Sequence, residues 1–158
     1  MFDTFFGLPV HPLIVHATEV VVPIAALVLL LAAVWPRFCR WAKLLPLGLT
    51  LAALVLVPLS TESGEALEER VSESALIDTH ADLAEGLLPW VIGMVLIAAV
   101  LFWWNLKKAP TTRAPKWVAI AIAVAALGAS SGTVVQAILI GHSGATAVWS
   151  EDMGTPAQ

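Results

Sequence analysis

The chain has 158 residues, of which 59% are hydrophobic and only 13% are charged, and its formal net charge at pH 7 is −4. An ordinary soluble domain of this size carries about twice that share of charge, so the composition excludes this class and predicts an integral membrane protein. We expect one membrane domain over residues 1–158. The single cysteine, Cys39, excludes an internal disulfide within one copy.

Four continuous apolar runs follow one another along the chain and predict four membrane-spanning helices. They cover about residues 12–35, 44–61, 76–106 and 117–141. Roughly 20 helical residues cross a ~30 Å hydrocarbon core, so each run is long enough or nearly so. The runs do not alternate between polar and apolar residues, which argues against a membrane barrel. The predicted fold class is all-α: an integral membrane four-helix bundle with up-down topology.

The charges are distributed unevenly between the connections. Seven of the eight basic residues lie in residues 36–43 and 107–116, whereas all twelve acidic residues lie elsewhere. The positive-inside rule therefore predicts that these two connections are cytoplasmic, as in a multi-pass protein of the cell inner membrane. Both termini and the acidic connection 62–85 then lie on the outer side.

The acidic connection is rich in Glu and Ala and is compatible with helix. We expect Gly64 to break or bend the exit from the second span, with a short amphipathic helix over residues 65–71 and a second helix that runs into the third span. No internal repeat is evident. The similar length of the two helix hairpins follows from having four spans.

The chain has four histidines, and the topology places all of them at the outer end: His11, His16, His80 and His142. Imidazole is the commonest metal ligand and a usual axial ligand of haem iron. His16 and Glu19 lie inside an apolar run, where ionisable groups are costly and often functional. We predict one outer-face site from His16, His80 and His142, with His16 and His142 as the ligand pair. We expect His11 to lie outside the site, at the start of the first helix.

The fourth run contains two glycines, Gly128 and Gly132, separated by one helical turn. Small residues at this spacing let a neighbouring membrane helix approach closely. We therefore predict that both glycines serve helix packing.

Several functions agree with these features. The leading hypothesis is a small redox protein that binds b-type haem and transfers electrons to a partner protein on the outer side. The alternative is a site for a divalent transition metal, used in sensing or delivery and built from the four residues His16, Glu19, His80 and His142, with Glu62 or Glu65 as further ligands. A third hypothesis is a structural or partner-binding membrane protein without a cofactor.

Other classes are disfavoured. The chain has no nucleophile elbow, metalloprotease motif or phosphate loop, so an enzyme is the weaker interpretation and no catalytic residue is assigned. The basic residues are already explained by topology, which argues against nucleic-acid binding. The lipid bilayer is the one partner that the composition requires, and homo-oligomer formation stays open.

Four segments carry a resemblance to a known family: GLPVHPLIVH at the start, TESGEALEE after the second run, THADLAEG before the third and GHSGATAVW after the fourth. Together they resemble the bacterial four-helix membrane family called domain of unknown function 2231. The resemblance covers nearly the whole chain. It implies a four-helix inner-membrane protein with histidines at one end, sometimes found beside redox modules such as Rieske or cytochrome-type domains.

Overall fold

The computed structural model describes residues 4–72, 74–106 and 115–149. A short hairpin of β1 (Thr4–Phe5) and β2 (Leu8–Pro9) precedes the helices α1 (His11–Val34), α2 (Pro36–Ala42), α3 (Leu45–Glu68), α4 (Ala75–Glu85), α5 (Leu87–Leu106) and α6 (Lys116–Trp149). Four helical stretches are long and apolar enough to cross a membrane: α1, α3, α4 together with α5, and α6. The prediction of an all-α bundle with four apolar helices is confirmed.

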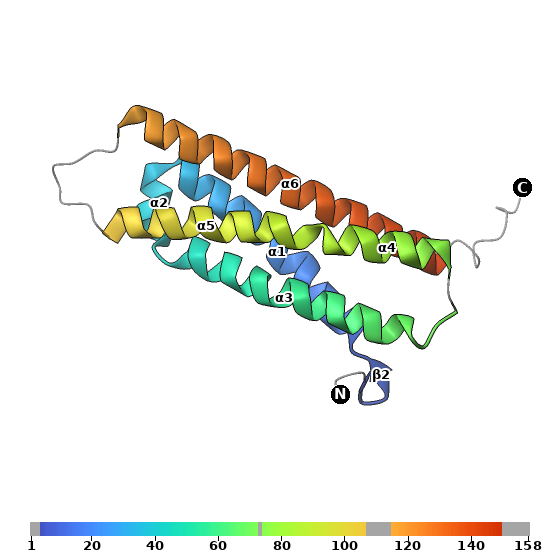
Figure 1. The fold of residues 1–158 in the computed structure, drawn as a ribbon. Helices are drawn as coiled ribbons and strands as arrows, with labels where there is room; N and C mark the ends of the chain where they lie inside the picture. The colour runs from blue at the N-terminus through green and yellow to red at the C-terminus, as the bar shows by residue number, and fades with distance from the viewer. Residues whose placement is uncertain (1–3, 73, 107–114, 150–158) are drawn as a thin grey trace, which may run out of the picture.

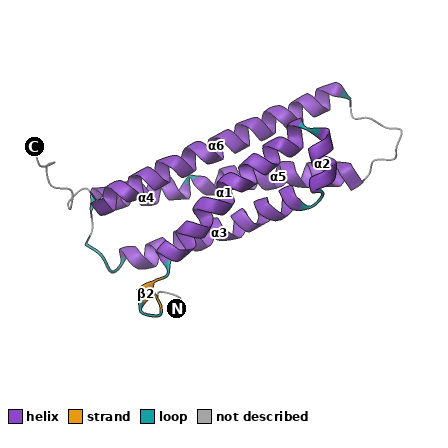
Figure 2. Ribbon diagram, turned by 180° about the vertical axis from the view of Figure 1, so that it is seen from behind, coloured by secondary structure: helices purple, strands orange, loops and turns teal. Residues whose placement is uncertain are grey.

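The four long helices lie side by side along one axis (Figure 1). In the first hairpin, residues 11–68, α1 packs against α3; in the second hairpin, residues 75–149, α4 and α5 pack against α6. The hairpins meet where α1 contacts α6 and where α3 contacts α5. The start of α1, the end of α3, all of α4 and the end of α6 lie at one end of the bundle, called here the histidine end. Figure 2 shows α2 at the opposite end.

Small and aliphatic side chains fill the core between the helices. Ala25, Leu29, Ala53 and Met94 are fully buried, whereas leucines such as Leu96 point outwards. This distribution is typical of a membrane bundle, in which lipid covers large apolar residues and small residues allow close helix contact. A buried hydrogen bond from Ser130 Oγ in α6 to the Ala26 carbonyl in α1, 3.0 Å long, joins the two hairpins in the core.

The polar ends of the helices differ from the sequence expectation. Gly64 lies inside α3, which continues to Glu68, so the predicted break at Gly64 and the separate helix over residues 65–71 are wrong. Glu, Ala and Leu are strong helix formers and carry α3 through this segment. Similarly, α6 extends to Trp149 and not only to residue 141. The helix that was expected to run continuously into the third span is interrupted at Gly86, between α4 and α5. Pro89 has no N–H to donate to the carbonyl of Glu85.

One of the two predicted packing glycines lies at a helix contact. A Cβ built on Gly132 would be 2.4 Å from the nearest ring carbon of Trp90 in α5, so the indole occupies the space that a side chain would need. Gly128, one turn earlier, has no neighbouring atom within 4 Å of such a Cβ and is exposed. The packing prediction therefore holds for Gly132 and is wrong for Gly128.

The opposite end of the bundle contains α2, a short helix that was not predicted from the sequence. Its aromatic rings form a row: Trp35 stacks on Phe38 with centroids 6.2 Å apart, and Phe38 contacts Trp41 at 5.7 Å. Cys39 faces inwards, where its sulfur accepts a 2.9 Å hydrogen bond from Asn105 Nδ2. Of the two predicted cytoplasmic connections, residues 36–43 lie at this end, and residues 107–114 of the other fall outside the described residues.

Candidate histidine site

His11, the first residue of α1, lies against the last part of α3. Its Nδ1 is 3.1 Å from the backbone carbonyl oxygen of Ser60 and 3.1 Å from Oγ of Ser63. The ring rests on Gly64, where an added Cβ would be only 3.1 Å from Cε1 of His11. The imidazole is half-buried. Although His11 begins the helix as expected, it also forms a contact between two helices of the bundle.

His80 of α4 lies against the last part of α6 in a similar way. Its Nδ1 is 3.0 Å from Oγ of Ser143, and its Cε1 would be 2.9 Å from a Cβ on Gly144. This ring is also half-buried. The glycines in both contacts remove the side chain that would otherwise hold the imidazole away from the helix backbone.

For His11, a hydrogen bond to a backbone carbonyl fixes which ring nitrogen carries the proton. A backbone carbonyl can only accept, so the Nδ1 of His11 is the donor to Ser60. Ser63 Oγ uses its own proton on the Ser60 carbonyl at 2.9 Å, and Ser143 Oγ uses its proton on the Ile140 carbonyl at 2.9 Å. With these protons on the carbonyls, both hydroxyl oxygens would accept from Nδ1–H, which for His11 is the form that the Ser60 carbonyl already requires. Among the described residues, no hydrogen bond is made to Nε2 of His11 or His80, so these lone pairs are available.

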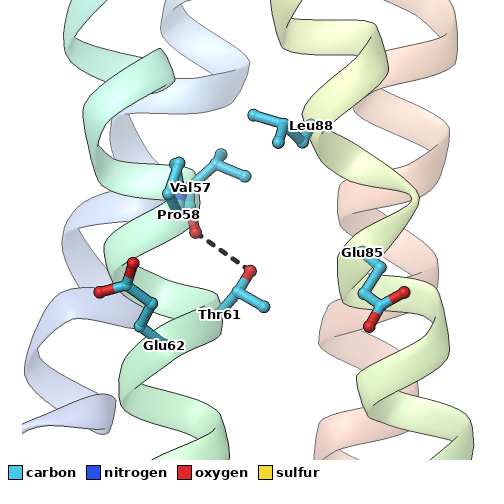
Figure 3. Close-up of a pocket in the computed structure, with 6 residues that line it drawn as sticks. All are labelled: Val57, Pro58, Thr61, Glu62, Glu85 and Leu88. Atoms are coloured by element: carbon cyan, nitrogen blue, oxygen red, sulfur yellow. Dashed lines mark hydrogen bonds between the residues drawn. The ribbon is translucent and has the colours of Figure 1, made fainter.

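The two rings come from different hairpins and both lie at the histidine end. A cleft of about 210 Å³ opens between α3 and the α4–α5 junction, and its lining residues, which do not include the histidines, are Val57, Pro58, Thr61, Glu62, Glu85 and Leu88. Figure 3 shows Thr61 pointing from α3 towards α4 and Leu88 pointing back towards α3. The cleft is thus apolar at its inner part and has carboxylates at its rim.

The other two histidines are exposed. His16 donates from Nδ1 to the Pro12 carbonyl one turn earlier, on its own helix. His142 is also exposed and follows Gly141, where an added Cβ would be 3.7 Å from Oε1 of Glu19. Of the residues predicted for the site, His80 therefore lies between helices and His16 and His142 are exposed. Glu19 is exposed as well, but its carboxylate lies against Gly141 of α6, where α1 and α6 meet.

Sequence reasoning missed His11 as a contact residue, and it missed both serines. The signal was present: His11 lies seven residues before the buried Thr18, and His80 lies seven before the buried Leu87, so each histidine continues the inward face of its helix. Over the described residues, no group of three or more His, Cys, Asp and Glu side chains is placed to hold a metal ion. The site is a pair of imidazoles.

These features define a class of protein: a four-helix membrane bundle with paired, oriented imidazoles at one end. The family model described as "Predicted membrane protein (DUF2231)" matches residues 7–157, so the chain belongs to this family. The resemblance found in the sequence is confirmed. No curated protein and no solved structure matches the chain.

Proposed function

We propose that the protein is a small redox protein of the cell inner membrane that holds b-type haem between its two hairpins through one imidazole from each. The observation that carries this proposal is the geometry of His11 and His80. Each ring has its Nδ1 engaged by the protein and its Nε2 available. Histidines that ligate iron or zinc generally donate the other ring N–H to a neighbouring acceptor, which fixes the orientation of the ring.

The donor set fits haem. Haem iron takes one or two axial imidazoles and needs no further protein ligand, whereas a structural metal ion usually takes four. Two histidines without a third ligand group in the described chain agree with the first case. When bound, haem would supply one-electron transfer. The chain would contribute the two ligands, the serine oxygens that orient them, and the apolar wall of Val57 and Leu88 that limits water.

The available space sets a condition on this proposal. The cleft of about 210 Å³ is smaller than the roughly 300–1,000 Å³ of pockets for ligands of this size. Haem therefore requires the hairpins to separate further at the histidine end. The contacts of α3 with α4 are sparse compared with those within each hairpin, whereas α1 packs closely against α6, so we expect this opening on the α3–α4 side.

Charge supports an orientation with the histidine end outside. The exposed basic residues Arg37, Arg40 and Lys43 lie at the opposite end, as does Lys116 at the start of α6. Under the positive-inside rule, that end faces the cytoplasm. A redox partner would then approach His11 and His80 from the outer side.

A second candidate is a divalent-metal site for sensing or delivery, and one observation favours it. Glu62 and Glu85 line the same small cleft, which suits a hydrated ion better than a macrocycle, and their charge attracts cations. In this version His11 and His80 supply two ligands and water completes the coordination sphere.

The four histidines provide a matched set of variants for the test. Each is changed singly to alanine, and each protein is purified from cells supplied with haem and transition metals. We expect the parent to show a Soret band, and we expect His11→Ala and His80→Ala to lose or shift it. His16→Ala and His142→Ala should retain it.

Three other outcomes have definite meanings. A blank visible spectrum with stoichiometric metal, lost in the same two variants, would select the metal version. Loss of the ligand in His16→Ala and His142→Ala, but not in the other two variants, would support the ligand pair predicted from the sequence. A parent protein that binds neither haem nor metal would refute both cofactor proposals.

A further inference from the structure

The two half-buried histidines, His11 and His80, make the same contacts with a serine and a glycine. Each ring places Nδ1 about 3 Å from a serine Oγ, each serine hydroxyl donates over 2.9 Å to the carbonyl three residues earlier, and each ring lies on the glycine that follows the serine. In the first hairpin the set is His11, Ser63 and Gly64; in the second it is His80, Ser143 and Gly144. Both sets bridge the two helices of their own hairpin.

The match extends through the membrane-spanning parts. When His11 is aligned with His80, four of the six buried residues of α1 fall on the four buried residues of α5: Thr18, Val22, Ala25 and Leu29 on Leu87, Val91, Met94 and Ala98. When Ser63 is aligned with Ser143, Pro46, Thr50 and Ala53 of α3 fall on Ala126, Ser130 and Thr133, the buried residues of α6. The inward faces of the two hairpins thus match helix by helix, with an offset of 69 residues for the first helices and 80 residues for the second.

Sequence and helix contacts follow the same alignment. Identical residues in α3 and α6 are Leu47-Gly48 with Leu127-Gly128, Val55 with Val135, Leu59 with Leu139, and Ser63-Gly64 with Ser143-Gly144. The contact of α1 with α6 corresponds to that of α5 with α3, and both are present. This pattern of contacts is the one expected of two hairpins related by an approximate two-fold axis along the bundle, as in membrane proteins built from parallel repeats.

We infer that the two hairpins are equivalent repeats, and that Ser63 and Ser143 are matched positioning residues that hold His11 and His80 in the Nδ1–H form with Nε2 free. The repeat and the positioning role stand on these contacts, and only the identity of the ligand that the two Nε2 atoms would bind rests on the proposed function. The inference gives that ligand a defined place, on the axis between the hairpins, with one donor from each repeat.

The serines are not expected to be equally important to their rings. Ser143 Oγ is the hydrogen-bond partner that the structure shows for Nδ1 of His80, whereas Nδ1 of His11 also has the Ser60 carbonyl. A neutral histidine in water favours the Nε2–H form, so removal of the acceptor should release His80 to that form. Removal of the Ser63 hydroxyl should change His11 much less.

The test measures the protonation of each ring nitrogen in the full chain without any added ligand. The protein is labelled with ¹⁵N-histidine and placed in lipid nanodiscs at a pH where the rings are neutral, and the ¹⁵N shifts of Nδ1 and Nε2 are read. Single alanine variants of the other histidines assign the signals. We expect Nδ1–H at both His11 and His80 in the parent, and predominantly Nε2–H at His80 in Ser143→Ala.

Two matched variants separate positioning from general damage. Ser143→Thr retains the hydroxyl and should restore the Nδ1–H form. Thr146→Ala removes a hydroxyl of α6 that bonds the His142 carbonyl and should leave His80 unchanged. If the parent also binds haem or metal, Ser143→Ala should weaken that binding about 10- to 100-fold, as expected for loss of a group that orients a ligand.

Nε2–H at either ring of the parent, or an unchanged His80 in Ser143→Ala, would overturn the inference. Because the tautomer is measured without ligand, failure of the proposed function gives a different result. A parent that shows the expected tautomers but binds neither haem nor metal would refute the cofactor and leave the positioning role in place.

Discussion

Gly132 offers a quantitative test of how the second hairpin is packed. The perturbation is Gly132→Ala, which adds one methyl group at a point where three ring carbons of Trp90 lie at 2.4, 2.5 and 2.7 Å. Carbon atoms in contact are normally about 3.5–4.0 Å apart, so either the indole or α6 has to move. Overpacking of this kind costs about 1–3 kcal/mol.

The opposing effect is the higher helix propensity of alanine. Replacing glycine by alanine inside a helix stabilises it by up to about 1 kcal/mol. The variant Gly128→Ala isolates this propensity effect, because Gly128 lies one turn away in α6 and a Cβ there has no atom within 4 Å. We therefore expect Gly128→Ala to be neutral or stabilising, and Gly132→Ala to be about 1–3 kcal/mol less stable than Gly128→Ala.

The assay is unfolding in detergent followed by the loss of helical circular dichroism. A second measurement assigns the difference to Trp90: in a Trp90→Ala background the ring is absent, so the two glycine variants should have equal stability. Equal stability of Gly132→Ala and Gly128→Ala in the parent background would show that the indole yields without cost. That result would refute the packing argument.

Three further predictions test the core, the topology and the link between α4 and α6. Ser130→Ala should lower the free energy of unfolding by about 0.5–1.5 kcal/mol because it removes the buried bond to α1, whereas Ala in place of the exposed Ser131 should have no effect in the same unfolding assay. If the histidine end is outside, an impermeant thiol reagent should label Ser72→Cys in intact cells. Labelling only after permeabilisation would show the opposite orientation, and buried Cys39 should stay unlabelled in both cases. Gln136→Leu should lose the 2.6 Å bond to the backbone of α4 and speed hydrogen exchange there, and unchanged exchange would contradict a restraining role.

The burial of Cys39 changes how the topology has to be tested. In the sequence this residue belongs to a predicted cytoplasmic connection, where failure to react with an impermeant reagent would indicate the inner side. Cys39 is instead buried in α2, where its sulfur accepts a hydrogen bond from Asn105. Failure to label it therefore indicates nothing about orientation, and an exposed position such as Ser72 is needed.

The spans were predictable because lipid imposes a simple requirement. A run of about 20 apolar residues has no other stable arrangement in a bilayer than a helix, so α1, α3, α5 and α6 follow from composition alone. The helix ends beyond the hydrocarbon obey no such rule. α3 nevertheless continues through Gly64 and α6 continues to Trp149, and the rings of His11 and His80 pack on these extensions.

The histidine pairing was harder to predict because depth and direction are different properties. His11 and His16 lie at similar depths, but five residues of helix separate their directions by about 140°, so one faces the bundle when the other faces outwards. The same geometry separates His142 from Ser143, which point about 100° apart. The sequence-based prediction chose His16 and His142 because their helices are neighbours with outer ends at the same level, whereas the direction of the buried face decides which histidines contact other helices.

The repeat of two helices has a consequence for how the chain enters the membrane. A unit that crosses twice returns to the side on which it began, so a second copy joined by a short segment inserts in the same orientation. A unit of one or three spans would arrive inverted. If only one hairpin were inverted during synthesis, His11 and His80 would be separated by the ~30 Å hydrocarbon core and no common ligand could reach both. The basic connection of each hairpin, although remote from the imidazoles, therefore determines whether the pair is ever assembled.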